Sequence, residues 1–254
     1  MRDGVRALAL RMTTTTTSEI VARLERLDTC VVSDALDALE LPGVVPGLVP
    51  LWECGRVAGS VHTVLLREVG DVAVVAGGPH LGARAIEASA PGEVVVVANA
   101  GRLGSAAWGG LLSAGARVRG IAAAVIDGAS RDVDEAVSLG FPLFARAATP
   151  VSARGRTVEE ATDVPVAIGE VVVVPGDFVL ADRSGVVFIA RAVVSEVLDR
   201  AERLTARERS MHEEIERGAS ITTVMDGRYE SMLTTPQGEA GVGPADRGGA
   251  HARG

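Results

Sequence analysis

An arginine and an aspartate stand side by side as Arg131 and Asp132, soon after an apolar run that ends in Asp127 and Gly128. A guanidinium group binds carboxylates through its fork of N–H donors, whereas a carboxylate binds hard cations such as Mg²⁺. Ligand sites in α/β proteins form where strands end in polar loops. The pair therefore predicts a small site that holds an anion beside a cation. The alternative is an exposed ion pair on a surface turn, which contributes little.

Lysine does not occur in the chain, because all 25 basic residues are arginines. A Schiff-base aldolase, a pyridoxal-phosphate enzyme and a Walker-type phosphate loop each need a lysine amine, so these three classes are excluded. Carbonyl chemistry here needs an electron sink made from a metal ion or from oriented hydrogen-bond donors.

Composition also limits the partners and the compartment. The formal net charge is −8, so the surface as a whole repels phosphate backbones and we expect no general nucleic-acid binding. Cys30 and Cys54 are too isolated for a disulfide framework or a zinc knuckle, which fits a reducing compartment. Apolar runs such as those at 94–98 and 171–174 are far shorter than the roughly 20 residues that span a bilayer. We expect a cytoplasmic protein without a membrane segment.

The elements that would position Arg131 and Asp132 follow from the hydrophobic pattern. Strand-like and helix-like runs alternate through the middle of the chain, which predicts βαβ units, right-handed crossovers and a partly parallel sheet. After Pro150, short strands separated by tight turns predict a β-rich layer, and an apolar stripe predicts a long helix. The expected strands are 55–66, 93–98, 121–126, 142–145, 164–168, 170–174, 177–181 and 185–189, and the expected helices are 20–27, 33–39, 81–90, 106–118, 133–138 and 192–217.

A chain of 254 residues that is 47% apolar can bury a substantial core. We expect one α/β domain over residues 18–233. Residues 1–17 include a run of threonines and are expected to form a flexible leader. Residues 234–254 are rich in Gly, Pro and Ala and are expected to form a disordered tail.

Several other polar residues have structural explanations. Asp34 follows Ser33 at an expected helix start, where capping explains it. Asp127 could support Asp132, although an Asp-Gly turn needs no ligand. The turn from Asp182 to Gly185 is expected to be structural, and neither His62 nor His80 has a metal-spaced partner.

Three segments resemble the RraA-like family: PGEVVVVANAG, AAWGGLLSAGARVRGIAAAVIDGASRDVDEAVSLGFPLFAR and VVVVPGDFVLADRSGVVFI. The resemblance covers residues 32–220 and depends most on the combination of WG, VIDG and RD. This family includes regulators of ribonuclease activity and class II 4-hydroxy-4-methyl-2-oxoglutarate aldolases. The resemblance implies a single layered α/β domain with a swivelling β/β/α-type core and a mixed sheet flanked by helices. It also implies a homotrimer or a dimer of trimers.

The resemblance implies roles for individual residues. Asp132 matches the aspartate that binds Mg²⁺ or Mn²⁺ directly, with waters completing the shell. Arg131 matches the arginine that contacts the carboxylate of a 2-oxo acid and the developing enolate oxygen. Leu111 and Leu112 match positions whose backbone N–H groups meet the substrate carboxylate at a helix start, next to Gly110.

Glu208 aligns with a glutamate that reaches the metal through water from the neighbouring subunit. The alternative is a solvated helix glutamate paired with Arg203 or Arg207. His212 shares the helix face of Glu208, and a lone helical histidine is more often a surface or packing residue than a ligand.

One departure concerns the acid that handles protons. The aldolases of the family carry a carboxylate in a GxxxD pattern twenty residues before the Arg-Asp pair. In this chain the two positions are Ala106 and Gly110. The anion and metal sites could survive this change, but the proton donor must be a different group or water.

The resulting expectation is a divalent-metal lyase that cleaves a carbon–carbon bond of a small 2-oxo acid. The reaction is either a retro-aldol cleavage of a 4-hydroxy-4-methyl-2-oxoglutarate-like substrate or the decarboxylation of oxaloacetate, and both leave a pyruvate enolate. One alternative is a non-catalytic regulator that binds an RNA-processing enzyme through its acidic surface. Another is a member of the family repurposed for specialised metabolism, in which open space at Gly110 admits a larger substrate.

Overall fold

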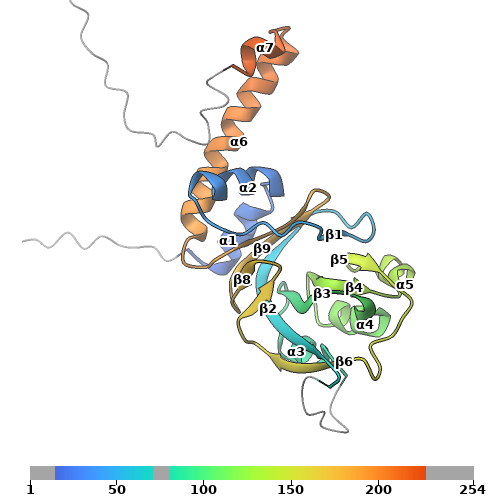
Figure 1. The fold of residues 1–254 in the computed structure, drawn as a ribbon. Coiled ribbons are helices and arrows are strands. Elements are labelled where there is room, and N and C mark those ends of the chain that lie inside the picture. The colour runs from blue at the N-terminus through green and yellow to red at the C-terminus, as the bar shows by residue number, and fades with distance from the viewer. Residues whose placement is uncertain (1–14, 71–79, 227–254) are drawn as a thin grey trace, which may run out of the picture.

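Most of the chain folds around one mixed sheet (Figure 1), and the computed structural model describes residues 15–70 and 80–226. The helices are α1 (Thr17–Leu24), α2 (Thr29–Ala38), α3 (Ala83–Ala88), α4 (Gly110–Val118), α5 (Val133–Leu139), α6 (Val194–Glu216) and α7 (Ile221–Val224). The strands are β1 (Val49–Pro50), β2 (Val57–Glu68), β3 (Val94–Trp108), β4 (Ala123–Ser130), β5 (Leu143–Ala148), β6 (Thr157–Thr162), β7 (Val166–Ile168), β8 (Val171–Val173), β9 (Phe178–Asp182) and β10 (Gly185–Ile189).

The centre of the sheet is parallel and its edges are antiparallel. Strands β5, β4, β3 and β2 lie next to one another in that order and run parallel. Parallel neighbours need crossover connections, and α3, α4 and α5 lie in the three connections between them. Strand β1 adds antiparallel to β5, β6 and β9 add antiparallel to β2, and β10 pairs with β9. The expected mixed sheet flanked by helices is confirmed.

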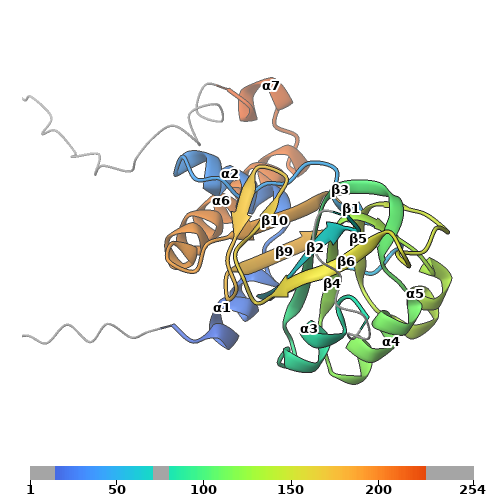
Figure 2. The same cartoon turned by 60° about the horizontal axis from the view of Figure 1, so that its bottom comes forward.

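Two groups of helices cover different parts of the sheet. Helices α1, α2 and α6 pack together beside β9 and β10, whereas α3, α4 and α5 lie at the parallel end (Figures 1 and 2). Each group of helices packs on its own apolar core. Strand β2 connects the two parts of the sheet, since its first residues pair with β9 and its later residues pair with β3. Arg131 and Asp132 follow the end of β4 and lie on the side of the sheet's parallel end, near α4 and α5.

Strand β3 is much longer than the pattern predicts. The expected strand 93–98 continues to Trp108, and three register shifts in its pairing with β4 accommodate the extra residues. The prediction that a helix starts at 106 is therefore wrong, because Ala106 pairs with Ala129 and Trp108 with Ser130. Helix α4 begins only at Gly110. Small residues have no strong strand preference, so pairing with β4 decides their conformation.

The start of α2 also differs from the prediction. Asp28 is the N-cap, and its carboxylate accepts a hydrogen bond from the backbone N–H of Val31 at 2.9 Å. The proposed cap region at Ser33 and Asp34 is wrong, since both residues lie inside the helix. An aspartate five residues earlier in the chain satisfies the same helix start.

The remaining differences concern short elements and the chain ends. Strands β1 and β6 and helix α7 were not expected from the pattern. Helix α1 starts at Thr17 with a capping box between Thr16 and Glu19, within the segment expected as a leader. Residues 1–14 of that leader and the whole expected tail, 234–254, lie outside the described residues. Among the helices of residues 15–70 and 80–226, none is both long and apolar enough to cross a membrane.

Candidate active site

The ends of β3 and β4 form the frame of the site. Trp108 and Ser130 are paired at the last register position, and the Trp108 carbonyl accepts hydrogen bonds from Arg131 N–H at 3.0 Å and Ser130 Oγ at 3.2 Å. The Trp108 ring is buried, stacks on Phe141 and donates from Nε1 to Ser113 Oγ of α4 at 3.0 Å. Trp108 therefore fixes the position of α4 relative to Arg131 and Asp132.

Asp132 has a backbone conformation that L-residues seldom adopt. Its φ is +57°, and it is the N-cap of α5 without making a side-chain cap bond to that helix. The carboxylate instead accepts from the backbone N–H of Gly110 at 3.1 Å and from Arg131 Nε at 3.1 Å to each oxygen. A left-handed aspartate is costly, and such outliers cluster at functional sites.

The surroundings of Asp132 keep its carboxylate ionised. The hydrogen bond from Gly110 N–H has the largest effect and lowers the pKa of Asp132, with Arg131 adding to the shift against the opposing effect of burial. An ionised carboxylate at this position suits a hard cation. It does not suit a proton donor at neutral pH.

The start of α4 offers hydrogen-bond donors to an anion. Gly109 is the N-cap and has no side chain that could cap the helix, so Asp132 accepts one first-turn N–H in its place. The N–H groups of Leu111 and Leu112 have no carbonyl partner within the helix. A helix N-terminus with such N–H groups favours negative charge. Leu111 and Leu112 both lie in this first turn.

Two consecutive glycines let two carboxylates approach the start of α4. An ideal Cβ on Gly109 would lie 3.0 Å from Asp132 Oδ2, and one on Gly110 would lie 1.8 Å from Glu135 Oε2. The expectation of open space at Gly110 is therefore wrong, because the end of the Glu135 side chain fills it. Glu135 is a residue that the sequence reasoning missed.

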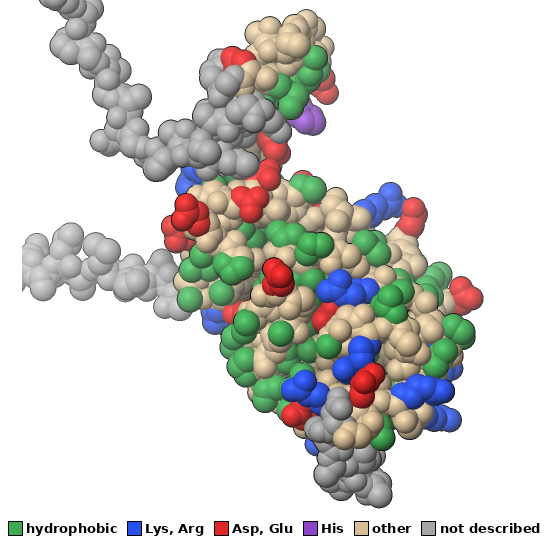
Figure 3. All heavy atoms as spheres, viewed as in Figure 1, with side chains coloured by type: hydrophobic (Ala, Val, Ile, Leu, Met, Phe, Trp, Pro, Cys, Tyr) green, Lys and Arg blue, Asp and Glu red, His purple; other side chains and the backbone are tan. Residues whose placement is uncertain are grey.

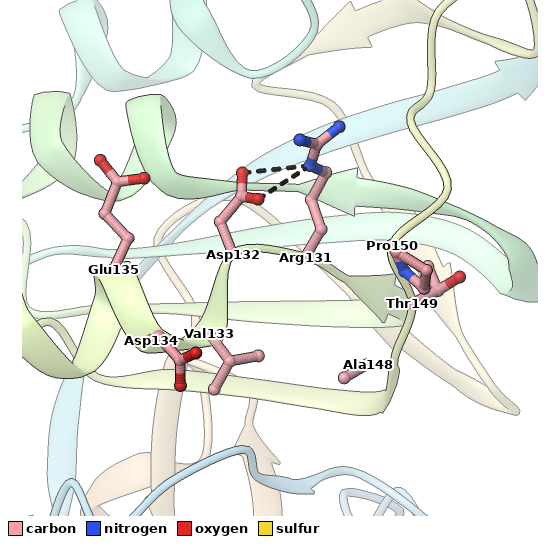
Figure 4. A pocket seen from close by; sticks show the side chains of 8 residues that line it. All are labelled: Arg131, Asp132, Val133, Asp134, Glu135, Ala148, Thr149 and Pro150. Carbon is pink, nitrogen blue, oxygen red and sulfur yellow. Dashed lines mark hydrogen bonds and ion pairs between the residues drawn. The ribbon is translucent and has the colours of Figure 1, made fainter.

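Two adjoining pockets share the Arg-Asp pair. One has a volume of about 550 Å³ and runs along α5 toward the end of β5, as the side chains in Figure 4 show. The other has a volume of about 450 Å³ and lies over the start of α4. The second pocket is lined by His80, Leu81, Ala106, Trp108, Gly109, Gly110, Leu111, Leu112, Arg131, Asp132, Ser152, Ala153 and Arg154.

The guanidinium groups of the second pocket are free to bind an anion. Figure 4 shows the terminal nitrogens of Arg131 turned away from Asp132, and only its Nε is bonded within the described part of the chain. Arg154 is exposed, and its guanidinium has no hydrogen bond or ion pair to any residue that the structure describes. The sequence offered no signal for Arg154, because it lies in a loop with no motif.

Glu208 lies on α6, whereas Arg131 and Asp132 lie between β4 and α5. Helix α6 packs on α1 and α2 and projects from the body (Figure 1). Burial, followed by the negative charges of Asp28 and Asp34, raises the pKa of Glu208. Acidic side chains gather around the base of α6 in Figure 3. The single chain therefore does not bring Glu208 to the site.

The other polar residues named from the sequence lie outside the two pockets, apart from His80. Asp127 is buried within β4, and Arg146 Nε donates to it at 2.6 Å, so it pairs away from Asp132. Asp182 accepts two hydrogen bonds from Thr29 at the start of α2, which supports the structural explanation. His62 is buried and bonded to Thr162.

The side chains near Asp132 offer few ligands to a cation. Within residues 15–70 and 80–226 no group of three or more His, Cys, Asp or Glu side chains is arranged to hold a metal ion. A zinc site built from protein ligands is therefore not found in this part of the chain. Mg²⁺ usually keeps several waters and binds through one or two carboxylates plus the substrate, which fits the single ionised Asp132.

Sequence comparisons connect the chain to known proteins. Residues 29–188 match the RraA-like family, described as Aldolase/RraA. A Halalkalibacterium halodurans protein named as a candidate 4-hydroxy-4-methyl-2-oxoglutarate aldolase is 30% identical over 201 residues, which are 78% of this chain and 90% of that protein. An uncharacterised Methanocaldococcus jannaschii protein is 35% identical over 133 residues, or 52% of this chain. That match spans 64% of the relative's own length.

Solved structures share the fold. An uncharacterised protein from Pseudomonas syringae pv. tomato superposes with a TM-score of 0.74 and 30% identity, covering 84% of this chain and 100% of that one. Streptomyces coelicolor RraAS2, described as an unusual member of the RNase ES inhibitor RraA protein family, superposes with a TM-score of 0.67 and 26% identity. That match covers 80% of this chain and 98% of RraAS2.

Proposed function

The chain belongs to the RraA-like family, and on that premise we propose that it is a divalent-metal-dependent lyase that cleaves a carbon–carbon bond of a small 2-oxo acid. The observation that carries the proposal is the convergence of three features on one pocket. These are the unbonded terminal nitrogens of Arg131, the ionised carboxylate of Asp132 and the first-turn N–H groups of α4.

The pocket supplies what such a substrate needs. A 2-oxo acid has a carboxylate and an adjacent carbonyl, and charge accumulates on the carbonyl oxygen when the bond breaks. The N–H groups of Leu111 and Leu112 would hold the carboxylate, and Arg131 would contact the carbonyl oxygen. Donors fixed in advance stabilise this charge without reorganising.

Asp132 would hold Mg²⁺ or Mn²⁺, which supplies Lewis-acid polarisation of the 2-oxo group when bound. Its hydrogen bond from Gly110 and its contact with Arg131 fix the direction of the carboxylate. The backbone of Asp132 is left-handed rather than extended as at most N-caps, and its side chain makes no cap bond to α5.

Arg154 favours substrates that carry a second carboxylate. It provides a second cationic group on the wall of the pocket that contains Arg131. Two guanidinium groups on one pocket favour a substrate with two carboxylates. Both 4-hydroxy-4-methyl-2-oxoglutarate and oxaloacetate meet this condition.

Glu208 would act only in an assembly. The long α6 projects beyond the body of the chain (Figure 1), so it can reach a neighbouring subunit. We propose a homotrimer or a dimer of trimers in which Glu208 completes the site of a neighbour through water. Activity would then require the assembly.

The test is pyruvate release from oxaloacetate and from 4-hydroxy-4-methyl-2-oxoglutarate, with Mg²⁺ and with EDTA. Release that needs both the metal and Asp132 supports the proposal, with Asp132→Ala as the comparison. Release equal to the metal-only background from both substrates contradicts it.

A second function is favoured by the match to RraAS2 and by the missing acid at Gly110. In this case the chain would bind an RNA-processing enzyme without catalysing a reaction. The acidic surface would face a basic partner surface. Metal-independent capture of a purified ribonuclease by the wild-type chain, together with no pyruvate release, would support this alternative.

A further inference from the structure

Glu135 occupies the place of the side chain that Gly110 lacks. An ideal Cβ on Gly110 would lie 1.8 Å from Glu135 Oε2, 2.4 Å from Cδ and 3.1 Å from Oε1. These distances are too short for a side chain at 110 and the present position of Glu135 to coexist. The carboxylate therefore lies over the first residue of α4, at the position where the sequence led us to expect an acid.

Helix α5 fixes the location of this carboxylate. Asp132 is the N-cap of α5, and its carbonyl accepts a hydrogen bond from Glu135 N–H at 3.1 Å. Asp132 and Glu135 thus project from one helical turn, and both are directed toward α4 in Figure 4. Asp134 lies between them in sequence and points away. The carboxylates of Asp132 and Glu135 differ in their hydrogen-bond partners, and this difference decides which of them can exchange a proton.

The Glu135 carboxylate is exposed and is not engaged. It accepts no hydrogen bond and forms no ion pair with any residue in 15–70 or 80–226. Asp132, in contrast, is bonded to Gly110 and Arg131. A group that takes up and releases a proton during turnover must be free to do so.

The proposed lyase reaction needs such a group. A guanidinium group does not serve as an acid or a base in proteins, and the hydrogen bond from Gly110 N–H lowers the pKa of Asp132, which disfavours its protonated form. His80 lines the pocket over the start of α4, whereas Glu135 lines the adjoining pocket, and both pockets contain Arg131 and Asp132. Asp132 and Glu135 both place a carboxylate beside the glycines at the start of α4, and Asp132 is already hydrogen-bonded there.

We propose that Glu135 is the acid–base residue of the site, in a proposal that depends on the lyase function. In the retro-aldol reaction its carboxylate takes the proton of the C4 hydroxyl. The C3–C4 bond then breaks, its electron pair forms the enolate over C2 and C3, and C4 becomes the ketone of one pyruvate. Protonated Glu135 returns the proton to C3, which gives the second pyruvate. In oxaloacetate decarboxylation CO₂ leaves and only the last step is needed, with water resupplying the proton to Glu135.

The test moves the acid from one helix to the other. Glu135→Gln keeps the shape and removes the proton exchange. The double variant Gly110→Asp, Glu135→Ala places a carboxylate on α4 in the space that Glu135 vacates. Asp134→Asn is the matched control, since it removes an acid from the same first turn of α5 without touching the space at Gly110. His80→Gln tests the competing group.

The measurements are steady-state pyruvate release and the exchange of pyruvate methyl protons in D₂O, followed by NMR with Mg²⁺. We expect Glu135→Gln to lower kcat and the exchange rate about 100-fold with little change in KM, and the double variant to recover about tenfold. Asp134→Asn should retain wild-type rates, and His80→Gln should lose less activity than Glu135→Gln. Mn²⁺ affinity, measured by electron paramagnetic resonance, should be nearly unchanged in Glu135→Gln.

The outcomes separate this inference from the lyase proposal. A wild-type chain that neither cleaves nor exchanges contradicts the lyase function itself. An active wild type with an equally active Glu135→Gln overturns the role of Glu135 alone. Loss of Mn²⁺ binding in Glu135→Gln would also overturn it, because Glu135 would then be a metal ligand. A double variant that folds, binds Mn²⁺ and stays as inactive as Glu135→Gln would contradict the positional argument.

Discussion

Substitutions at Asp132 should separate three contributions of this residue to the free energy of unfolding. Its carboxylate caps α4 through Gly110 N–H, it contacts Arg131, and its backbone is left-handed with φ +57°. The variants Asp132→Ala, Asp132→Asn and Asp132→Gly remove these contributions in different combinations. Their stabilities can therefore be compared with one another.

The expected magnitudes follow from the structure. Loss of a helix cap costs about 1 kcal/mol. The ion pair with Arg131 is more than a third exposed on both sides, so it adds at most about 0.5 kcal/mol. Asp132→Ala loses both contacts and keeps the backbone strain, so it should lower the free energy of unfolding by about 1–1.5 kcal/mol.

The other two variants should lose less stability than Asp132→Ala. Asp132→Asn keeps a carbonyl acceptor and tolerates φ > 0, so the loss should be at most about 0.5 kcal/mol. Asp132→Gly loses the cap but relieves a left-handed conformation worth about 1 kcal/mol, so the two effects should nearly cancel.

Urea denaturation followed by circular dichroism measures these differences as shifts of the midpoint at a constant m-value. The expected order of stability is wild type, then Asn and Gly close together, then Ala. Equal losses in all three variants would refute the capping argument. A stable Asp132→Ala variant would show that Gly110 N–H needs no acceptor.

Two further predictions concern residues on either side of the site. Arg154→Gln should raise KM for oxaloacetate about tenfold while a 2-oxo acid with one carboxylate is affected little, and equal effects on both would contradict the role of Arg154 in binding a second carboxylate. Glu208→Gln should stabilise the isolated chain above the ordinary titration range of glutamate, because an acid whose pKa is raised on folding destabilises the folded state once it ionises. The gain in stability should vanish as the pH falls below that range, and a gain in urea midpoint that does not depend on pH would contradict the charge argument. In the assembly, Glu208→Gln should also lower lyase activity.

The parallel half of the fold could be predicted from hydrophobic pattern, whereas some element boundaries could not. The valine-rich run at 94–98 identifies the buried part of β3, because only a strand buries such a run on both faces. The continuation through Ala106 to Trp108 depends on pairing with β4, which local sequence does not encode. The cap at Asp28 was missed because Ser33 offered an equally plausible signal.

The site could be predicted only where its residues are neighbours in sequence. Arg131 and Asp132 are adjacent and follow a strand, so their common location was visible. Glu135 reaches Gly110 only because α5 packs against α4, and Arg154 reaches the same pocket through a loop. Such contacts depend on tertiary structure, and no local pattern encodes them.

The most direct measurement is pyruvate release from oxaloacetate and 4-hydroxy-4-methyl-2-oxoglutarate by the wild-type chain and by Asp132→Asn, each with Mg²⁺ and with EDTA. Asp132→Asn is the better variant here because it should keep the fold while removing the charge. We expect release by the wild type with Mg²⁺ and background rates in the other three conditions. Release that continues in EDTA or in folded Asp132→Asn, or no release by the wild type from either substrate, would contradict it.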